Sequence, residues 1–368
     1  MSPVNKPVPF LNLTNEFATL EADWLKDISA TGHAASFILG PNVQAFEKEF
    51  AEAVGVKHAI SVANGTDALI LSLRALGIGP GDEVITSPYT FFASAEAINI
   101  VGATPVFADI EEKSFCLDPD SVEQFITKKT RAIIPVHIFG HAARMDRFLQ
   151  LAEKHNLKIV EDCAQAYGSK FDGRMVGSMG DTGSYSFYPT KVLGGYGDGG
   201  MITTNSSEID AHLRRLRNHG AVSPFIHTEI GYNSRLDEIQ ASLLRRKLRV
   251  IDKAIAGRRQ VAEAYHARLK DSALVLPQAP EIEQHAYNLY TIRIAERDAV
   301  RARLTEQQIG TALCYPQGLH LQEVYKGLNY KPGSLPVTEK ACTEALSLPI
   351  YPGMPESDID RVCSSLLT

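Results

Sequence analysis

The sequence has few cysteines, and none of them are paired at a metal-binding spacing. Five cysteines occur in 368 residues, an odd number, and no two of them stand in a C-x-x-C arrangement. Such a set argues against a disulfide framework and against a structural zinc site. We therefore expect free thiols in a reducing, cytoplasmic location, and no metal ion.

Long apolar runs and an excess of positive charge are also absent. No apolar run approaches the roughly 20 residues that a membrane-spanning helix needs. Lysine and arginine number 37 against 43 aspartates and glutamates, which gives a formal net charge of −6. A groove for polyanions is normally basic, so we expect neither a membrane nor a nucleic acid as partner. The motifs H-E-x-x-H, G-x-S-x-G and Gly-Lys-Ser/Thr do not occur, which disfavours metalloproteases, α/β-hydrolases and Walker-type nucleotide binding.

What the first 240 residues do contain is an alternation of short apolar runs with longer helical patterns. Strands are predicted at 58–62, 83–86, 105–110, 132–138 and 158–161. Helical patterns at 67–76 and 93–101 lie between them. This alternation is typical of an α/β protein, in which helices cover both faces of a mainly parallel sheet.

The pattern changes near residue 237. Residues 236–269 form one long, charged, helix-forming stretch without proline, and two short strands are predicted after it, at 287–294 and 346–350. We therefore predict a large domain over residues 1–250 and a smaller C-terminal α+β domain over residues 251–368.

Ligands of open parallel sheets bind at the carboxyl ends of the strands, where we find four polar or aromatic groups. The first is Asn64-Gly65-Thr66-Asp67, between a strand and a helix. Gly65 allows close approach of the backbone, Thr66 is suited to the N-cap, and a helix N-terminus attracts phosphate. An ordinary capped helix is the alternative.

The second and third groups are a carboxylate and a lysine. Asp162 directly follows the predicted strand at 158–161, where a buried carboxylate needs a cation or several hydrogen bonds; a helix cap is the alternative. Lys191 lies between an apolar, proline-containing segment and the glycine-rich residues 194–200. A lysine that is partly removed from water has a lowered pKa and becomes an amine nucleophile toward carbonyl groups.

The fourth group is aromatic and follows the strand at 83–86. Tyr89, Phe91 and Phe92 offer rings that stack on a flat ligand, although core packing is the commoner role of such residues. Together, a phosphate site, a carboxylate, a lysine and an aromatic ring are what pyridoxal phosphate requires. The lysine holds its aldehyde as a Schiff base, and the carboxylate pairs with its protonated ring nitrogen.

Motifs of one family then occur in order along nearly the whole chain. They are FILGP, ANGTDAL, GPGDEVIT, PVHIFG, EDCAQAYG, SFYPTK with GYGDGG, LRNHG, GYNSRLDEIQA and LHLQ. With these motifs the chain resembles the DegT/DnrJ/EryC1/StrS aminotransferases, which act mainly on nucleotide-linked keto sugars. The resemblance implies fold type I of the pyridoxal-phosphate enzymes. In this fold a large domain has a mostly parallel sheet between helices, and a smaller α+β domain follows.

The resemblance also implies roles for individual residues. Lys191 matches the catalytic Schiff-base lysine, and Asp162 matches the partner of the ring nitrogen. The other implied cofactor-binding residues are Gln165 at the 3′-oxygen, Phe91 as the stacking ring with Tyr89 as its alternative, and Gly65, Thr66 and Ser186 at the phosphate.

Three further positions concern the partner subunit and the substrate. Asn233 matches an asparagine that reaches the phosphate from a neighbouring subunit, so the resemblance implies a homodimer with shared active sites. Tyr315 and His320 lie in the family's substrate-side loop and are candidates for sugar contacts. Packing is their alternative role.

The implied reaction is ping-pong transfer of an amino group from glutamate to a keto sugar, with pyridoxamine phosphate as the second cofactor form. Lysine rather than histidine at position 191 favours transamination over dehydration. Gln165 within EDCAQAYG is more similar to members that aminate C3 of a dTDP- or UDP-linked 3-keto sugar.

Several alternatives stay open at this point. C4 amination is one, and a cyclitol or aromatic precursor in antibiotic assembly is another. Outside the enzymes, the alternatives are a cofactor-bound regulatory protein and a plain nucleotide-binding module.

Overall fold

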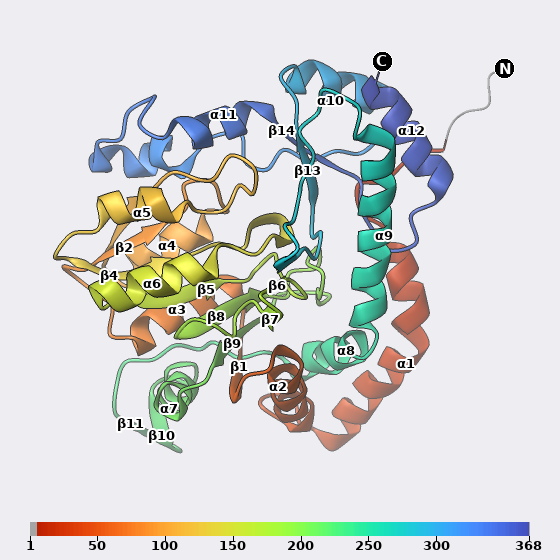
Figure 1. The fold of residues 1–368 in the computed structure, drawn as a ribbon. Coiled ribbons are helices and arrows are strands. Elements are labelled where there is room, and N and C mark those ends of the chain that lie inside the picture. The colour runs from red at the N-terminus through yellow and green to blue at the C-terminus, as the bar shows by residue number, and fades with distance from the viewer. Residues whose placement is uncertain (1–5, 368) are drawn as a thin grey trace.

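The computed structural model describes residues 6–367; residue 368 and residues 1–5 of the predicted large domain lie outside it. A seven-stranded sheet forms the centre of the molecule (Figure 1). In spatial order its strands are β1 (His58–Val62), β9 (Gly200–Thr204), β8 (Thr182–Ser186), β5 (Lys158–Asp162), β4 (Thr130–Ile134), β2 (Glu83–Thr86) and β3 (Thr104–Phe107). Within this sheet β9 runs antiparallel to both of its neighbours, and the other adjacent pairs are parallel.

Helices cover both faces of this sheet, as the alternating pattern predicts. One face packs on α3 (Gly65–Ala75), α4 (Ala93–Ile100) and α7 (Ser207–Leu216), and the other on α2 (Pro41–Val54), α6 (Met145–His155) and α8 (Glu238–Leu248). Successive strand residues alternate between the faces. Ile159 of β5 joins the hydrophobic cluster of α6, and Val160 joins the cluster of α3 and α4.

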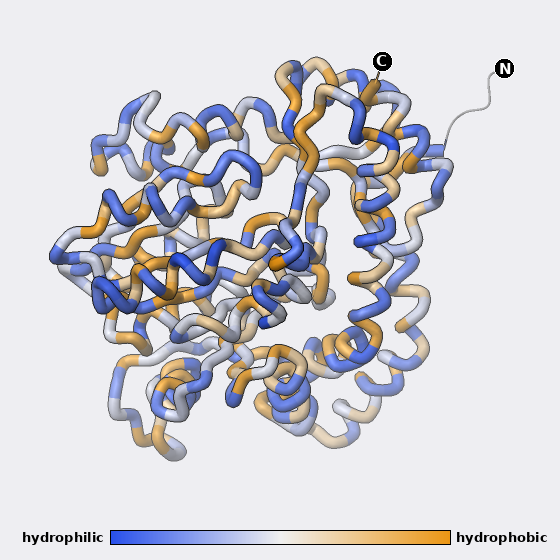
Figure 2. Tube along the Cα trace, viewed as in Figure 1, coloured by the Kyte–Doolittle hydropathy of each residue, from blue (hydrophilic) through white to orange (hydrophobic). Residues whose placement is uncertain are grey.

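The predicted strands of this sheet are confirmed as β1 to β5, with ends that differ by a few residues. Figure 2 shows alternating hydrophobic and hydrophilic residues along the outer helices, such as α9 (Ile251–Leu269). The predicted α/β fold class with a mostly parallel sheet is therefore confirmed.

The C-terminal part has a hydrophobic cluster of its own. Here β13 (Tyr290–Arg293) pairs antiparallel with β14 (Ala345–Leu348), and both pack with α9, α10 (Arg297–Glu306) and α12 (Glu356–Leu367). In Figure 1, α9 extends from the sheet domain's helix α8 toward α10 and α12. The division into domains at residue 250 stays a prediction.

The single helical stretch predicted over residues 236–269 is wrong in one respect. The structure interrupts it after Leu248, and α9 begins at Ile251. No proline or glycine lies at the break. Because α8 packs on α1 (Leu13–Ala34) and α2 while α9 packs on α12, the break follows from packing against different partners.

The remaining elements lie at the edges of the molecule. They are α5 (Pro119–Phe125), α11 (Pro336–Glu344), β6 (Lys170–Phe171), β7 (Arg174–Met175), β10 (Ala221–Ser223), β11 (Ile226–His227), β12 (Glu283–Gln284), and the 3-10 helices η1 (Ile138–Gly140), η2 (Leu319–Leu321) and η3 (Glu323–Leu328). Among residues 6–367, no helix is long and apolar enough to cross a membrane.

Candidate active site

A cavity of about 740 Å³ opens where β1, β2, β4, β5 and β8 end. This is the edge at which open parallel sheets bind ligands. The residues predicted from the sequence that line it are Gly65, Thr66, Phe91, Asp162, Gln165, Ser186, Lys191 and Tyr315. The fold thus brings together eight positions that are spread over 250 residues of sequence.

The first corner of the cavity is the start of α3. Asn64 is the N-cap, because its side chain accepts a hydrogen bond from the N–H of Asp67 at 2.8 Å. The suggestion that Thr66 is the N-cap is therefore wrong, and Thr66 lies in the first turn. At Gly65 an added Cβ would stand 2.7 Å from Cβ of Ser186, so only glycine lets these segments approach. The narrow, N–H-rich corner suits a phosphate.

Asp162 is the last residue of β5 and is buried, at 5% exposure. Its Oδ2 accepts a hydrogen bond from the hydroxyl of Ser94 at 2.7 Å, and its Oδ1 accepts one from the N–H of Ala164 at 3.1 Å. Burial raises the pKa of Asp162, and these two hydrogen bonds and Lys191 oppose that shift. The Ser94 hydroxyl and the Ala164 N–H therefore hold the carboxylate in place at the cavity wall.

Lys191 follows β8 at the start of the connection to β9. Its backbone N–H donates to the carbonyl of Tyr188 at 2.9 Å, so a tight turn sets the direction of the side chain. Burial lowers the pKa of the Lys191 amine, and the nearby Asp162 and Cys314 oppose the shift. A lowered pKa leaves more of the amine neutral and nucleophilic near neutral pH.

Gln165 and Tyr315 form a hydrogen-bonded pair in the cavity wall. The amide oxygen of Gln165 accepts the N–H of Phe139 at 2.9 Å, which fixes the orientation of the amide. Its nitrogen then donates to the hydroxyl of Tyr315 at 2.8 Å. Burial raises the pKa of Tyr315, so its hydroxyl stays protonated and serves as a donor.

The two aromatic candidates for stacking have different environments. Phe91 is 61% exposed and lines the cavity, whereas Tyr89 is fully buried. The hydroxyl of Tyr89 donates to the carbonyl oxygen of Cys314, and its ring stacks on Phe115. Phe91 is therefore the ring that a ligand in this cavity would meet.

Two predicted residues do not line this cavity. His320 is buried at 1% exposure, and its Nε2 lies 3.3 Å from Oε1 of Glu339. Asn233 is exposed, and its backbone pairs with Asn218. Its predicted role concerns a second subunit and stays a prediction.

Among the residues of the cavity wall that sequence reasoning missed are Thr90, Ser94, Tyr188 and Thr190. Tyr188 and Thr190 flank Pro189, two residues before Lys191, so their place in the SFYPTK segment was a usable signal. Ser94 lies in the first turn of α4 and carries no such signal, because only the order of the strands places α4 beside β5.

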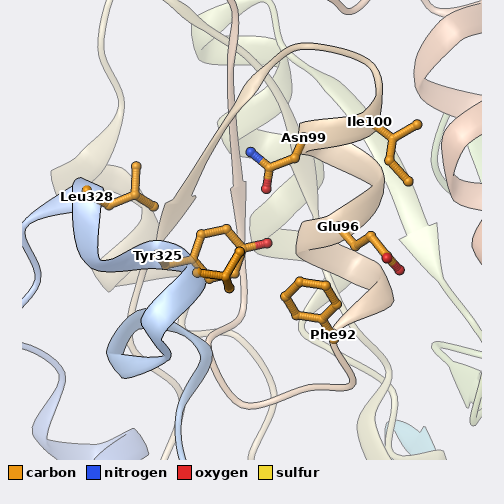
Figure 3. A pocket seen from close by; sticks show the side chains of 8 residues that line it. Phe92, Glu96, Asn99, Ile100, Tyr325 and Leu328 are labelled. Atoms are coloured by element: carbon orange, nitrogen blue, oxygen red, sulfur yellow. The ribbon is translucent and has the colours of Figure 1, made fainter.

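A second hollow of about 420 Å³ adjoins the cavity and shares Glu96 and Ile100 with it. Figure 3 shows Phe92, Glu96 and residues of α4 facing Tyr325 and Leu328 of η3. The hollow is largely apolar, and the hydroxyl of Tyr325 has no hydrogen-bond partner in it.

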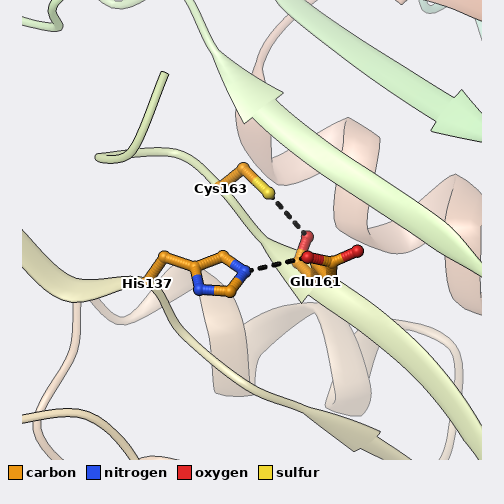
Figure 4. A group of neighbouring side chains, drawn as sticks. All are labelled: His137, Glu161 and Cys163. Atoms are coloured by element: carbon orange, nitrogen blue, oxygen red, sulfur yellow. Dashed lines mark hydrogen bonds and ion pairs between the residues drawn. The ribbon is translucent and has the colours of Figure 1, made fainter. Parts of the chain in front are cut away.

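Behind Asp162, His137, Glu161 and Cys163 approach one another closely enough to suggest a metal site (Figure 4). Their hydrogen bonds favour a structural role. Nδ1 of His137 accepts the N–H of Ala143 at 2.9 Å, so its Nε2 carries the proton and donates to Glu161 at 3.1 Å. Glu161 also accepts three backbone N–H groups at 2.7 Å, from residues 177, 179 and 180. Since both ring nitrogens of His137 are in use, the cluster anchors the end of β5.

Known proteins are similar to this chain over nearly its whole length. A protein from Geobacillus stearothermophilus named "Pleiotropic regulatory protein" is 44% identical over 98% of this chain and 97% of that protein. A UDP-N-acetyl-3-dehydro-alpha-D-glucosamine 3-aminotransferase from Acidithiobacillus ferrooxidans is 43% identical, with the same coverage. The crystal structure of DesV from S. venezuelae in complex with a ketimine intermediate is 40% identical, with a TM-score of 0.96 over 98% of both chains.

The comparison with protein families covers nearly the whole chain. The model of the DegT/DnrJ/EryC1/StrS aminotransferase family matches residues 19–367, which include every cavity residue described above. The chain therefore belongs to the DegT/DnrJ/EryC1/StrS aminotransferase family.

Proposed function

We propose that this protein is a pyridoxal-phosphate-dependent aminotransferase that moves the amino group of glutamate to C3 of a nucleotide-linked 3-keto sugar. The observation that carries the proposal is the meeting of Lys191 and Asp162 in one cavity. The amine has a lowered pKa, and the buried carboxylate acts on it across the cavity.

The residues present fit the cofactor. The amine of Lys191 would hold its aldehyde, the carboxylate of Asp162 its ring nitrogen, and the corner at Gly65 and Ser186 its phosphate. One N–H of the Gln165 amide donates to Tyr315. The other N–H would donate to the 3′-oxygen of the cofactor. When bound, pyridoxal phosphate supplies a ring that accepts electron pairs from the carbon beside the transferred nitrogen.

The protein's own groups move the proton. Nζ of Lys191, whose pKa is lowered by burial, takes the proton from the amino-bearing carbon of glutamate and later returns a proton to the sugar carbon. The ionised carboxylate of Asp162 only accepts hydrogen bonds, so it would stabilise the protonated, positively charged form of the cofactor's ring nitrogen. The Tyr315 hydroxyl, whose oxygen already accepts from Gln165, is placed to donate to an oxygen of the substrate.

Two observations support C3 as the site of amination. The relative from Acidithiobacillus ferrooxidans is named as a 3-aminotransferase of a UDP-linked sugar. Gln165, the residue that favours C3 from the sequence, lies in the cavity wall with its amide oriented by Phe139.

The test is turnover with glutamate and two substrates, a 3-keto and a 4-keto nucleotide sugar, with the product examined by NMR. We expect an amine at C3, a 2-oxoglutarate product and ping-pong kinetics. An amine at C4 would overturn the regiochemistry alone. No transfer to any keto sugar, cyclitol or aromatic ketone would instead favour a regulatory role such as the name of the Geobacillus relative suggests.

Charge supports a shared site between two copies of the chain. Among the described residues that line the cavity, Lys191 is the one lysine or arginine, while the carboxylates of Asp67, Glu96 and Asp198 add negative charge. A diphosphate in such a site needs further donors or cations. A second copy would supply them, with Asn233 as its contribution to the cofactor phosphate.

Mixed dimers test this arrangement. Lys191→Ala and Asn233→Asp chains are each expected to be nearly inactive alone. Co-expressed in equal amounts, they would pair at random, so about half of the dimers would be hybrids in which one of two sites has both native residues. The mixture would then have about a quarter of the native activity. Lys191→Ala co-expressed with the double variant is the control, and recovery there, or none in the mixture, would contradict the shared site.

A further inference from the structure

We infer that Thr90 and Ser94 form a one-way chain of hydroxyl groups that orients the Asp162 carboxylate and holds it in the ionised form for the cofactor. This inference rests on the proposed function. Thr90 and Ser94 act through Asp162, so both are positioning residues.

The direction of the chain follows from proton counting. An ionised carboxylate has no proton to give, so the 2.7 Å bond between Ser94 Oγ and Asp162 Oδ2 uses the only proton of the Ser94 hydroxyl. The hydroxyl of Thr90 lies 3.1 Å from Ser94 Oγ. Thr90 must therefore be the donor of that second bond, and both protons point toward Asp162.

The chain is shielded from water. Thr90 is 2% exposed, Ser94 is 1% exposed and Asp162 is 5% exposed. Hydrogen bonds polarise one another in such an environment, and a bond to a charged group is stronger than a bond between neutral groups. Since Oδ1 accepts from Ala164, the carboxylate has a designated donor on each oxygen and cannot rotate without breaking one.

Other titratable groups surround Asp162. Those that act on it electrostatically are Lys191, His137, Cys163 and Tyr315. Asp67, Glu96 and Asp198 line the same cavity. Of all these groups, Lys191 and His137 favour the ionised carboxylate, and neither donates a hydrogen bond to it. Ser94 is therefore the side chain whose removal should change the charge state of Asp162.

The experiment measures how tightly cofactor-free protein binds pyridoxal phosphate between pH 5 and 9. Loss of the Ser94 hydrogen bond raises the pKa of Asp162. As the solution is acidified, the affinity of the variant for pyridoxal phosphate should therefore begin to fall at a higher pH than that of the native protein. We expect Ser94→Ala to bind the cofactor about tenfold more weakly near pH 7. Thr90→Val, which keeps the volume, should shift the profile in the same direction by about threefold.

Matched variants separate this role from simple packing. Thr90→Ser retains the hydroxyl and should keep the native pH profile, while Ser94→Thr should restore the profile lost in Ser94→Ala. Unchanged profiles in both Ser94→Ala and Thr90→Val would overturn the inference. If Ser94→Ala fails to fold, the comparison of Thr90→Val with Thr90→Ser decides. Native protein that binds no pyridoxal phosphate would instead overturn the proposed function.

Discussion

Replacing Lys191 by alanine is expected to lower turnover with glutamate and a keto sugar by at least about a thousandfold. The variant loses the amine whose pKa burial lowers, and with it both the attachment point of the cofactor and the group that moves the proton. The measurement is the half-reaction with glutamate, followed by loss of the near-visible absorption of cofactor-loaded protein. Lys191→Ala should lack that glutamate-dependent change.

The control for this variant is Lys253→Ala, which removes an exposed lysine from α9, away from the cavity residues. It should keep native turnover and the native spectrum. Glutamate-dependent conversion in Lys191→Ala at more than a few per cent of the native rate would show that another group transfers the proton.

Asp162→Asn is expected to have opposite effects on activity and on stability. Without a carboxylate the charge on the cofactor ring is lost, so turnover should fall by about a hundredfold or more. In the cofactor-free protein, burial raises the pKa of Asp162 above its ordinary value of 3.8. An acid with a raised pKa in the folded state destabilises that state as the pH rises through it.

The free energy of unfolding of cofactor-free Asp162→Asn should therefore increase relative to that of the native protein as the pH rises from below 3.8 toward neutrality. Urea unfolding at a series of pH values measures this difference. Parallel curves for the two proteins would mean that Asp162 keeps an ordinary pKa in the fold. Asp181→Asn, which removes a carboxylate that pairs with Lys158 outside the cavity, is the control for a general effect of lost charge.

Five of the seven strands of the sheet were predictable because they are local apolar runs, and β1, β2 and β5 appear at almost the predicted positions. The strands β8 and β9 were not predicted. The order of the strands was not predictable from periodicity, because it depends on which crossovers the whole chain makes. Lys191 and Asp162 share a cavity because β8 lies beside β5. The resemblance to a family supplied that neighbourhood, which the spacing of the two residues does not.

Other misses have the same origin in tertiary packing. The helix break between Leu248 and Ile251 has no local signal. His320 is buried and hydrogen-bonded to Glu339, a contact that no sequence pattern predicts. At α3, Asn64 and Thr66 are both good N-cap residues, and only the backbone geometry decides in favour of Asn64.

The antiparallel strand β9 has a consequence for the order in which the chain folds during synthesis. The edge strand β1 (residues 58–62) pairs in the sheet with residues 200–204. During synthesis, β1 therefore cannot pair until more than half of the protein has been made. Sheets with such distant pairings fold slowly. The corner formed by Gly65 and Ser186 also closes late, and nascent chains shorter than about 200 residues cannot acquire affinity for the cofactor.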